Sequence, residues 1–407
     1  MNHNALLLTG LVLVGALSPA GDWPQILGPS RSGHAEGETI QPWTDAPQIL
    51  WKFECGSGYG GVAMAGGRVY LNHRVEDNNL LTCFDAESGG TVWTARFPAT
   101  YRGGYNADTG PRCVPVVSGG QVFCYSAAGT LAAFDTANGK LQWTRTLRED
   151  FAAEDGYFGA GASPIVAAGN VIVPVGGESG VVAVHCSDGE EAWKATTLEA
   201  DYASPVMLDA DTVVVPMRMQ TVGLFAINGN QEFKIPFGQR GLNVIGVTPS
   251  VSKNLVLLSA SYRIGAKLVD ASGPSLKTIW ENDDTLSSQY NSGVIIDDFV
   301  YGIHGREDQG VAELRCVELQ KGRVAWSKPG FGVAHLIAAG ETIIALTVTG
   351  KIELFSANSS EFKPLCSFEL PRGTYRALPA LSGGKLVCRS TDRGQGTLYA
   401  IDLTAAK

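Results

Sequence analysis

One repeated pattern constrains the fold of this 407-residue chain more than any other feature of its sequence. Each copy has three apolar runs separated by glycine-rich or polar turns, then an Asp/Gly turn and a short run with an aromatic residue. Apolar alternation between such turns predicts β-strands. The clearest copies occupy residues 63–93, 114–143, 163–193 and 293–326. Each copy therefore predicts four antiparallel strands.

The spacing of the aromatic residues identifies the architecture. A turn glycine precedes the final tryptophan by four residues in each clear copy, in the pairs Gly89/Trp93, Gly139/Trp143, Gly189/Trp193 and Gly322/Trp326. Weaker copies carry Phe233, Trp280 and Phe368 at the corresponding place, so the aromatics recur every 40 to 50 residues. Four strands in that period form one blade of a β-propeller.

The two ends of the pattern predict how the ring closes. The last copy begins at Leu378 and ends after its third strand, which would leave an open sheet edge. Near the other end, residues 48–54 place Trp51 where the final aromatic of a blade belongs, with no strands of its own blade before it. We expect this segment to complete the last blade. The fold is then an all-β propeller of eight four-stranded blades, with seven blades as the alternative.

The repeated tryptophans are expected to serve packing rather than ligand binding. A four-stranded sheet is only marginally stable alone and must bury its faces against its neighbours. An indole at a fixed place in each outer strand can fill the wedge between adjacent sheets and bury a large apolar area. The side chains assigned to this role are Trp51, Trp93, Trp143, Trp193, Trp280 and Trp326.

These residues resemble a known repeat family. Ala133, Asp135, Gly139, Lys140 and Trp143 match the tryptophan-docking motif of the pyrroloquinoline quinone (PQQ) repeat, which occurs in quinoprotein alcohol dehydrogenases and in the non-catalytic outer-membrane assembly propeller BamB. The resemblance covers residues 48–404 and implies a single eight-bladed domain. It implies no activity, because the motif is structural in every member.

The residues before the propeller divide into two parts. Residues 1–20 resemble a secretory signal peptide, with an apolar run from Ala5 to Leu17 followed by small residues, although no Lys or Arg precedes that run. Residues 21–47 form an extended segment in which "DWPQILGPSRSG" resembles exported BamB-like propellers. We therefore expect a protein of the periplasm or cell envelope, with no membrane-spanning segment.

Charge and cysteine content narrow the function classes. A formal net charge of −9 argues against nucleic-acid binding, which needs a positive surface. The eight cysteines contain no CxxC pair, and the six histidines occur singly, so no metal site is predicted. Cys113 and Cys124 face each other if a hairpin turn centres on Ser118–Gly119, and an exported protein could oxidise them. The alternative is two small core residues.

The sequence offers little catalytic equipment. The resemblance to quinoprotein dehydrogenases would imply PQQ beside a calcium ion, a carboxylate base, and a disulfide between adjacent cysteines against the cofactor. No two cysteines are adjacent, and Asp108 and Glu178 lie in no recognisable ligand cluster. We therefore expect no cofactor and no enzyme activity, with PQQ and calcium belonging only to the dehydrogenase alternative.

The segments that enter each innermost strand are unusually polar and aromatic, and a propeller gathers them at one mouth of its central funnel. Arginine and tyrosine together are typical of binding hot spots. The residues expected to point toward this mouth are Arg112, Tyr202, Tyr290, Asn291, His335, Tyr375 and Arg376. The alternative is that each caps a strand end and holds the loops between blades.

These features together predict a monomeric, exported scaffold that binds a protein or peptide at the funnel mouth or, by strand addition, at a blade edge. A PQQ-dependent alcohol dehydrogenase is the first alternative. A carbohydrate- or polymer-binding propeller that uses the funnel tyrosines is the second.

Overall fold

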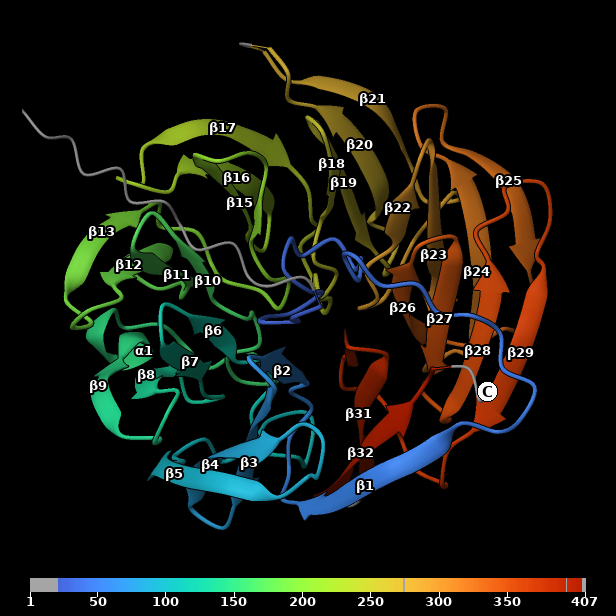
Figure 1. Ribbon diagram of the computed structural model, residues 1–407. Coiled ribbons are helices and arrows are strands. Elements are labelled where there is room, and N and C mark those ends of the chain that lie inside the picture. The colour runs from blue at the N-terminus through green and yellow to red at the C-terminus, as the bar shows by residue number, and fades with distance from the viewer. Residues whose placement is uncertain (1–20, 274, 393, 405–407) are drawn as a thin grey trace, which may run out of the picture.

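The computed structural model of the protein describes residues 21–273, 275–392 and 394–404. Over these residues the chain forms eight separate four-stranded antiparallel sheets, and Figure 1 shows them arranged as a ring. The predicted eight-bladed all-β propeller is confirmed, and the seven-bladed alternative is wrong. The only helix among the described residues is the short α1 (Leu147–Asp150). The proposed signal peptide, residues 1–20, lies outside the described residues.

The blades are numbered I to VIII in chain order, and the first four follow the repeat copies closely. Blade I contains β2 (Val62–Ala65), β3 (Arg68–Val75), β4 (Asn78–Asp85) and β5 (Thr91–Pro98). Blade II contains β6 (Val116–Ser118), β7 (Gln121–Tyr125), β8 (Thr130–Asp135) and β9 (Leu141–Thr146). Blade III contains β10 (Ile165–Ala167), β11 (Asn170–Pro174), β12 (Val181–His185) and β13 (Glu191–Ala195). Blade IV contains β14 (Val206–Met207), β15 (Thr212–Pro216), β16 (Gln220–Phe225) and β17 (Gln231–Pro236).

The second half of the ring continues the plan. Blade V contains β18 (Ser250–Ser252), β19 (Leu255–Ala260), β20 (Gly265–Asp270) and β21 (Lys277–Asn282). Blade VI contains β22 (Val294–Ile296), β23 (Phe299–Arg306), β24 (Val311–Glu318) and β25 (Arg323–Lys328). Blade VII contains β26 (Ala334–Ala339), β27 (Thr342–Thr347), β28 (Lys351–Ser356) and β29 (Pro364–Glu369). Blade VIII contains β30 (Ala380–Ser382), β31 (Lys385–Asp392), β32 (Gln395–Asp402) and β1 (Gln48–Cys55).

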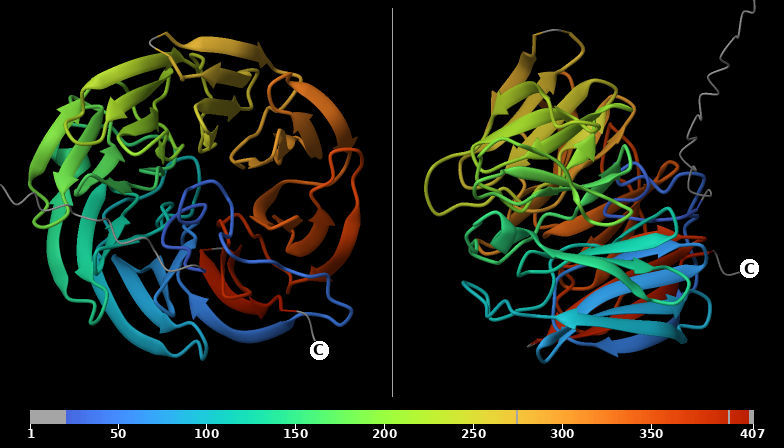
Figure 2. Two further views of the ribbon diagram at one scale, coloured as in Figure 1. Left: turned by 45° about the horizontal axis from the view of Figure 1, so that its top comes forward. Right: turned by 90° about the vertical axis from the view of Figure 1, so that its left-hand side faces the viewer.

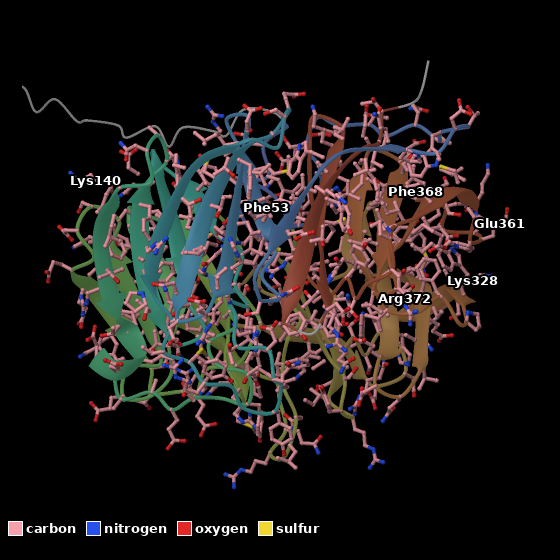
Figure 3. All side chains as sticks on the ribbon, turned by 90° about the horizontal axis from the view of Figure 1, so that it is seen from below. Phe53, Lys140, Lys328, Glu361, Phe368 and Arg372 are labelled. Carbon is pink, nitrogen blue, oxygen red and sulfur yellow. The ribbon has the colours of Figure 1, made fainter. Side chains whose placement is uncertain are left out.

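Blade VIII is made from both ends of the chain, as the sequence predicted. β1 pairs antiparallel with β32, from Gln48 opposite Asp402 to Cys55 opposite Gly396. Figure 2 shows the blue β1 strand lying along the red strands at the rim of the ring. Phe53 of β1 is labelled in Figure 3. On the side toward blade I, its ring meets the Phe84 ring of β4 edge-on, at 4.7 Å between centroids. The pairing gives β32 a partner and completes the fourth strand of the last blade.

The inner and outer strands of a blade differ in apolar content because they differ in burial. The second strand of a blade has neighbours on both faces, so β11 and β15 are buried at every position and their sequences are almost wholly apolar. The outermost strands face solvent, and β9 is largely exposed except for the buried Trp143. The period-two alternation therefore weakens from the rim of the ring toward its centre.

In six of the eight blades, an indole of the outer strand joins the blade to the one that follows it. The Trp93 Nε1 group donates a 3.0 Å hydrogen bond to the Thr136 carbonyl, and a Cβ atom added to Gly139 would lie 2.4 Å from Cε3 of the same indole. Five pairs of blades share this contact with a turn glycine, from Trp51 on Gly89, Trp93 on Gly139, Trp143 on Gly189, Trp193 on Gly229 and Trp280 on Gly322. Trp326 donates to the Asn358 carbonyl at 2.8 Å, over a turn that has no glycine.

A second set of hydrogen bonds joins the blades around the channel. Ser163, Ser204 and Thr248 each precede a proline at the entry to an innermost strand. The Val114 amide donates to Ser163 Oγ at 2.9 Å, the Ser163 amide to Ser204 Oγ at 2.9 Å, and the Ser204 amide to Thr248 Oγ1 at 3.2 Å. Backbone groups that no strand pairs are satisfied in this way by the next blade.

Replacing Gly139 by alanine is expected to lower the free energy of unfolding by about 3 kcal/mol. The new Cβ would displace the Trp93 indole, and the residue would also be held at a φ of +71°. Gly119→Ala is the matched control, because Gly119 has a φ of +57° with no neighbouring atom within 4 Å of an added Cβ. That control should lose only about 1 kcal/mol. Urea denaturation measures both, and equal losses would contradict a role for indole docking in stability.

Candidate functional site

The N-terminal segment closes one end of the central channel. Trp23 exchanges backbone hydrogen bonds of 2.7 and 2.8 Å with Met64 in the innermost strand of blade I, and the Val117 amide of blade II donates to the Pro24 carbonyl. On the other side of the ring, the Ala35 amide donates to the Ala338 carbonyl of blade VII at 2.8 Å. Figure 1 shows this blue segment crossing the centre of the ring. Residues 22–35 are therefore called the plug.

Arg31 holds the plug in place. Its side chain is 1% exposed and donates to the backbone carbonyls of Pro164 and, at 2.7 Å, Pro205, which belong to blades III and IV. Its Nε group donates to Gln25 Oε1 at 2.8 Å within the plug. Burial lowers the pKa of Arg31 to about 9, so it stays charged at neutral pH. A buried cation that is satisfied by backbone carbonyls fixes the plug across several blades at once.

Above the plug lies a cavity of about 430 Å³, which we call the funnel. Ile26 of the plug forms part of its lining, and the rest comes from loops that enter the innermost strands and from hairpins between second and third strands. Five aromatic rings face it, those of Tyr59, Phe158, Tyr202, Tyr262 and Tyr290. Because the plug covers the other end, the funnel opens on one face only, which we call the loop face.

Five of the seven residues predicted to share one mouth line the funnel: Arg112, Tyr202, Tyr290, His335 and Arg376. The prediction is wrong for the other two. The Tyr375 ring is wholly buried beneath Gly350, and its hydroxyl donates to the Pro371 carbonyl at 2.7 Å. Asn291 is 1% exposed and lies behind the lining, where its side chain contacts His335 Nδ1 at 3.2 Å.

Arg376, Glu307 and Tyr290 form one network on the funnel wall. The Arg376 Nε and Nη2 groups donate to the two Glu307 carboxylate oxygens at 3.0 and 2.8 Å. The Tyr290 hydroxyl donates to Glu307 Oε2 at 2.6 Å. Burial alone would raise the pKa of Glu307, but these hydrogen bonds and the Arg376 charge outweigh it and lower the pKa. The network is ionised and carries no net charge.

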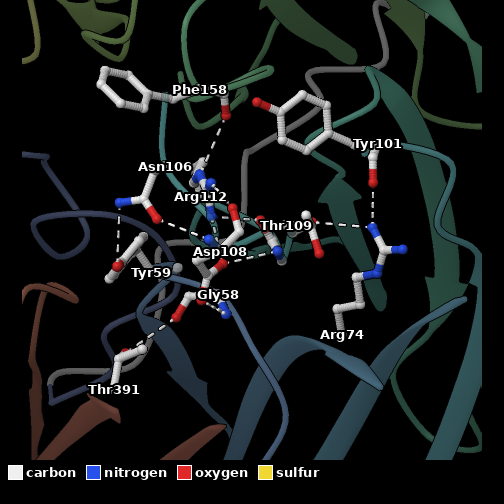
Figure 4. A network of polar contacts seen from close by, with 12 residues as sticks. Gly58, Tyr59, Arg74, Tyr101, Asn106, Asp108, Thr109, Arg112, Phe158 and Thr391 are labelled. Atoms are coloured by element: carbon white, nitrogen blue, oxygen red, sulfur yellow. Dashed lines mark hydrogen bonds and ion pairs between the residues drawn. The ribbon is translucent and has the colours of Figure 1, made fainter. Parts of the chain in front are cut away.

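Arg112 belongs to a similar network around Asp108, shown in Figure 4. Arg112 Nη1 lies 2.7 Å from Asp108 Oδ1, and the carboxylate also accepts from the Gly58 and Gly110 amides at 3.0 and 2.9 Å. The guanidinium groups of Arg112 and Arg376 lie 5.2 and 5.8 Å from the centre of the Tyr59 ring. The two arginines therefore position an aromatic ring and keep their charges internally paired.

Sequence reasoning missed Tyr59, Tyr262 and Glu307. Tyr262 and Glu307 lie on hairpins between second and third strands, whereas the repeat period indicates only the loops that enter the innermost strands. The sequence does contain one indication of Tyr59, because the two glycines that follow it, Gly60 and Gly61, are typical of a close backbone approach. A Cβ at either glycine would lie 2.6 Å or less from the carbonyl oxygen of Cys113 or Leu378, so these glycines allow close backbone contact beside the ring.

Cys113 and Cys124 do not face each other across the hairpin, so the possible disulfide is contradicted and the alternative of two small core residues holds. The turn between β6 and β7 centres on Gly119 and Gly120, whose φ angles are +57° and +78°. Ser118 therefore pairs with Gln121, and this register places Cys124 opposite residue 115. Both cysteines are buried and free. Positive φ at two successive positions favours a two-residue hairpin turn, which the double glycine indicates.

The funnel does not present the ligands of a quinone–calcium site. Of its two carboxylates, Glu307 is held by Arg376 and Tyr290, and Asp308 accepts from the Arg306 Nε group at 3.0 Å. No group of three or more His, Cys, Asp or Glu side chains able to hold a metal occurs in the described ranges. The donor set therefore does not fit calcium, which needs several free oxygen ligands.

Neither Asp108 nor Glu178, the two carboxylates that the sequence offers as calcium ligands, lines the funnel. Asp108 is taken up by Arg112 and two backbone amides. Glu178 is exposed between β11 and β12. Neither offers a free oxygen to the funnel.

The ring of four-stranded sheets with indoles on turn glycines defines the class of PQQ-type β-propellers. The sequence model of the family described as "Outer membrane protein assembly factor BamB" matches residues 43–328, so the chain belongs to this family. In the described part of the chain, no helix is long and apolar enough to cross a membrane.

Individual relatives are distant. BamB of Yersinia pestis is 22% identical over 264 residues, which cover 60% of this chain and 65% of that protein. The crystal structure of BamB from Moraxella catarrhalis is 14% identical with a TM-score of 0.64, covering 87% of this chain and 99% of that one. Quinohemoprotein alcohol dehydrogenase from Comamonas testosteroni is 13% identical with a TM-score of 0.72, covering 96% and 82%. Both structures show a shared fold.

His335 gives the site a measurable pH dependence. Its Nε2 atom lies 2.8 Å from the Arg376 carbonyl, and burial lowers its pKa to about 4. Because the unfolded state binds a proton near pH 6.5 and the folded state near pH 4, stability should fall as pH drops through this window, by up to about 3 kcal/mol. His335→Gln should remove this part of the pH slope.

His73 provides the comparison, because burial also lowers its pKa to about 4, at a site between blades VIII and I. Urea midpoints from pH 7 to 4 in the wild type and in each histidine variant measure the two contributions separately. A slope that does not change in His335→Gln would contradict a neutral, buried His335.

Proposed function

We propose that this protein is an exported, monomeric and non-catalytic scaffold, and that the funnel and its surrounding loop face hold a segment of a partner protein. The name of the Yersinia pestis relative describes that protein as an outer membrane protein assembly factor. Family membership supports a related role for this chain in the periplasm or cell envelope.

One observation carries the proposal: the funnel is blind, aromatic and internally neutralised. Arg112 and Arg376 are each paired with a carboxylate, so the cavity offers aromatic surface rather than free charge. Such a lining suits an apolar or aromatic side chain that is inserted from the loop face. The blade edges offer strand pairing but no comparable hollow.

A photo-crosslinking amino acid at Asn106 tests the proposal. Asn106 lines the funnel, where its side-chain amide contacts the Tyr59 hydroxyl at 3.4 Å. In periplasmic extract, irradiation should join the protein to a discrete partner from this position. The matched control carries the same group at Lys140, which is exposed on the outer rim (Figure 3). Equal crosslinking from both positions, or none from position 106, would contradict the proposal.

The dehydrogenase alternative is tested separately, because two of the structural neighbours are quinoprotein enzymes by their names. Purified protein is titrated with PQQ and calcium, and quinone absorbance and dye-linked alcohol oxidation are followed. We expect neither saturable binding nor turnover, since the funnel carboxylates are already engaged by Arg306, Arg376 and Tyr290. Turnover that requires both additions would establish the enzyme.

The carbohydrate alternative is tested by sedimentation with cell-wall material. Retention of the protein on that material, with release by soluble saccharide, would favour it over a protein partner.

A further inference from the structure

A second hollow lies on the loop face over blades V and VI, with a volume of about 940 Å³. Its walls come from the loop between β17 and β18, the β19–β20 hairpin and the β23–β24 hairpin. Four arginines line it, Arg240, Arg263, Arg306 and Arg315, together with the two carboxylates of Asp283 and Glu313. We call it the basic groove.

The arginines of the groove fall into two kinds. Arg306 is paired with Asp308, and Arg315 donates through Nε to Glu313 at 2.6 Å and through Nη1 to the Thr285 carbonyl at 2.8 Å. Arg240 and Arg263 are exposed, and neither has an ion-pair partner within the described ranges. Within the described residues the groove therefore has two unpaired cations against one carboxylate without an ion pair, that of Asp283. On a chain of net charge −9, this local positive surface attracts anionic groups.

The backbone holds Arg263 out at the tip of the β19–β20 hairpin. Tyr262 and Arg263 have φ angles of +68° and +64°, a left-handed conformation that non-glycine residues rarely adopt. The Arg306 guanidinium stacks on the Tyr262 ring at 4.1 Å, which fixes the tip from one side. Strained residues that surroundings hold in place concentrate at functional sites. Tyr262 also lines the funnel, so the groove and the funnel share a wall.

Two large apolar side chains lie in the same groove. Leu242 is 77% exposed on the β17–β18 loop, and Val311 is 61% exposed at the start of β24. Exposed apolar residues beside unpaired cations are typical of a protein-interaction surface. They lie in a hollow rather than on a projecting flat face, which favours a chain segment laid into the groove over insertion into a lipid surface.

The opposite side of the loop face has a different charge. A hollow of about 730 Å³ over blades II to IV is lined by Glu154, Asp155 and Glu199, with Arg148 and Arg218 paired to the last two. Glu154 is left without an ion-pair partner in the described part of the chain. An anionic ligand is therefore favoured in the hollow over blades V and VI and disfavoured in the hollow over blades II to IV. This charge difference fixes the orientation in which a charged ligand binds the loop face.

We propose that the basic groove binds an acidic segment of a partner protein, with carboxylates on Arg240 and Arg263 and apolar side chains against Leu242 and Val311. The inference rests on the proposed function, since it names the chemistry of a partner that binds the same face. The funnel receives an apolar side chain of that partner, and the groove receives its charged flank.

A labelled peptide tests the groove directly. The probe is a fluorescein-labelled peptide of about twelve residues, with glutamates interspersed with leucines in a Gly/Ser background, and its counterpart has lysine in place of glutamate. Fluorescence anisotropy at low salt should show saturable binding of the acidic peptide only, with weakening at high salt. The double variant Arg240→Glu/Arg263→Glu should bind about tenfold more weakly.

Matched variants separate the outcomes. Arg96→Glu reverses one charge on the outer strand β5, and it should bind like the wild type. Asn106→Trp fills the funnel and therefore reports whether the peptide occupies the funnel instead of the groove. Loss of binding in Asn106→Trp with none in the groove variant would place the peptide in the funnel, which overturns the groove and leaves the proposed function standing.

Three further results would overturn the groove proposal. These are failure of the wild type to bind the acidic peptide, equal binding of both peptides, and an equal loss of affinity in Arg96→Glu. Sedimentation with phosphatidylglycerol vesicles forms the last arm. Vesicle binding that depends on Arg240 and Arg263, without peptide binding, would assign the groove to a membrane. The crosslinking experiment at position 106 decides the proposed function independently of all these results.

Discussion

The contact on which the ring depends is the indole that six of the eight outer strands place on the turn of the next blade. Trp93 on Gly139 shows the chemistry: the ring takes the space that a Cβ would need, and its Nε1 group satisfies a carbonyl at the edge of the same turn. One side chain thus supplies apolar area, a hydrogen bond and a steric limit on the approach of two sheets. Around the channel, the serine and threonine hydroxyls make the complementary link between blades.

The functional character of the molecule follows from an element outside the repeat. The plug spans the channel from blade I to blade VII and is held by Arg31 against backbone carbonyls. A propeller channel open at both ends has two equivalent mouths, whereas this one has a floor. The charged side chains of the funnel wall form ion pairs. The unpaired cations lie in the neighbouring groove. The aromatic cavity and the unpaired cations therefore lie side by side on one face.

Most of the fold could be predicted from the sequence, because the repeat encodes it many times over. The closing strand was predictable from Trp51, because this residue occupies the final aromatic position of a blade although no strands of that blade precede it in the sequence. The site was only partly predictable. Strand-entry loops follow from the period and indicated Arg112 and Arg376, but partners such as Glu307 come from hairpins of another blade, and no local pattern joins the two. Tyr375 misled because its neighbour Arg376 faces the cavity while its own ring turns into the core.

The assembly of blade VIII from both chain ends has a consequence for biogenesis. β1 comes first among the strands of the propeller in chain order, so it is synthesised long before its partner β32. Until β32 is made, the earlier blades can form by local pairing. The backbone groups of β1 that bond to β32 stay unpaired during that time. Pairing of β1 with β32 joins the two strands that are farthest apart in the sequence, so it has the largest loop-closure entropy cost. We expect it to be the slowest step of folding. A chain that stalls before β31 and β32 would leave β1 without its partner and blade VIII incomplete, which exposes backbone groups to quality-control proteases.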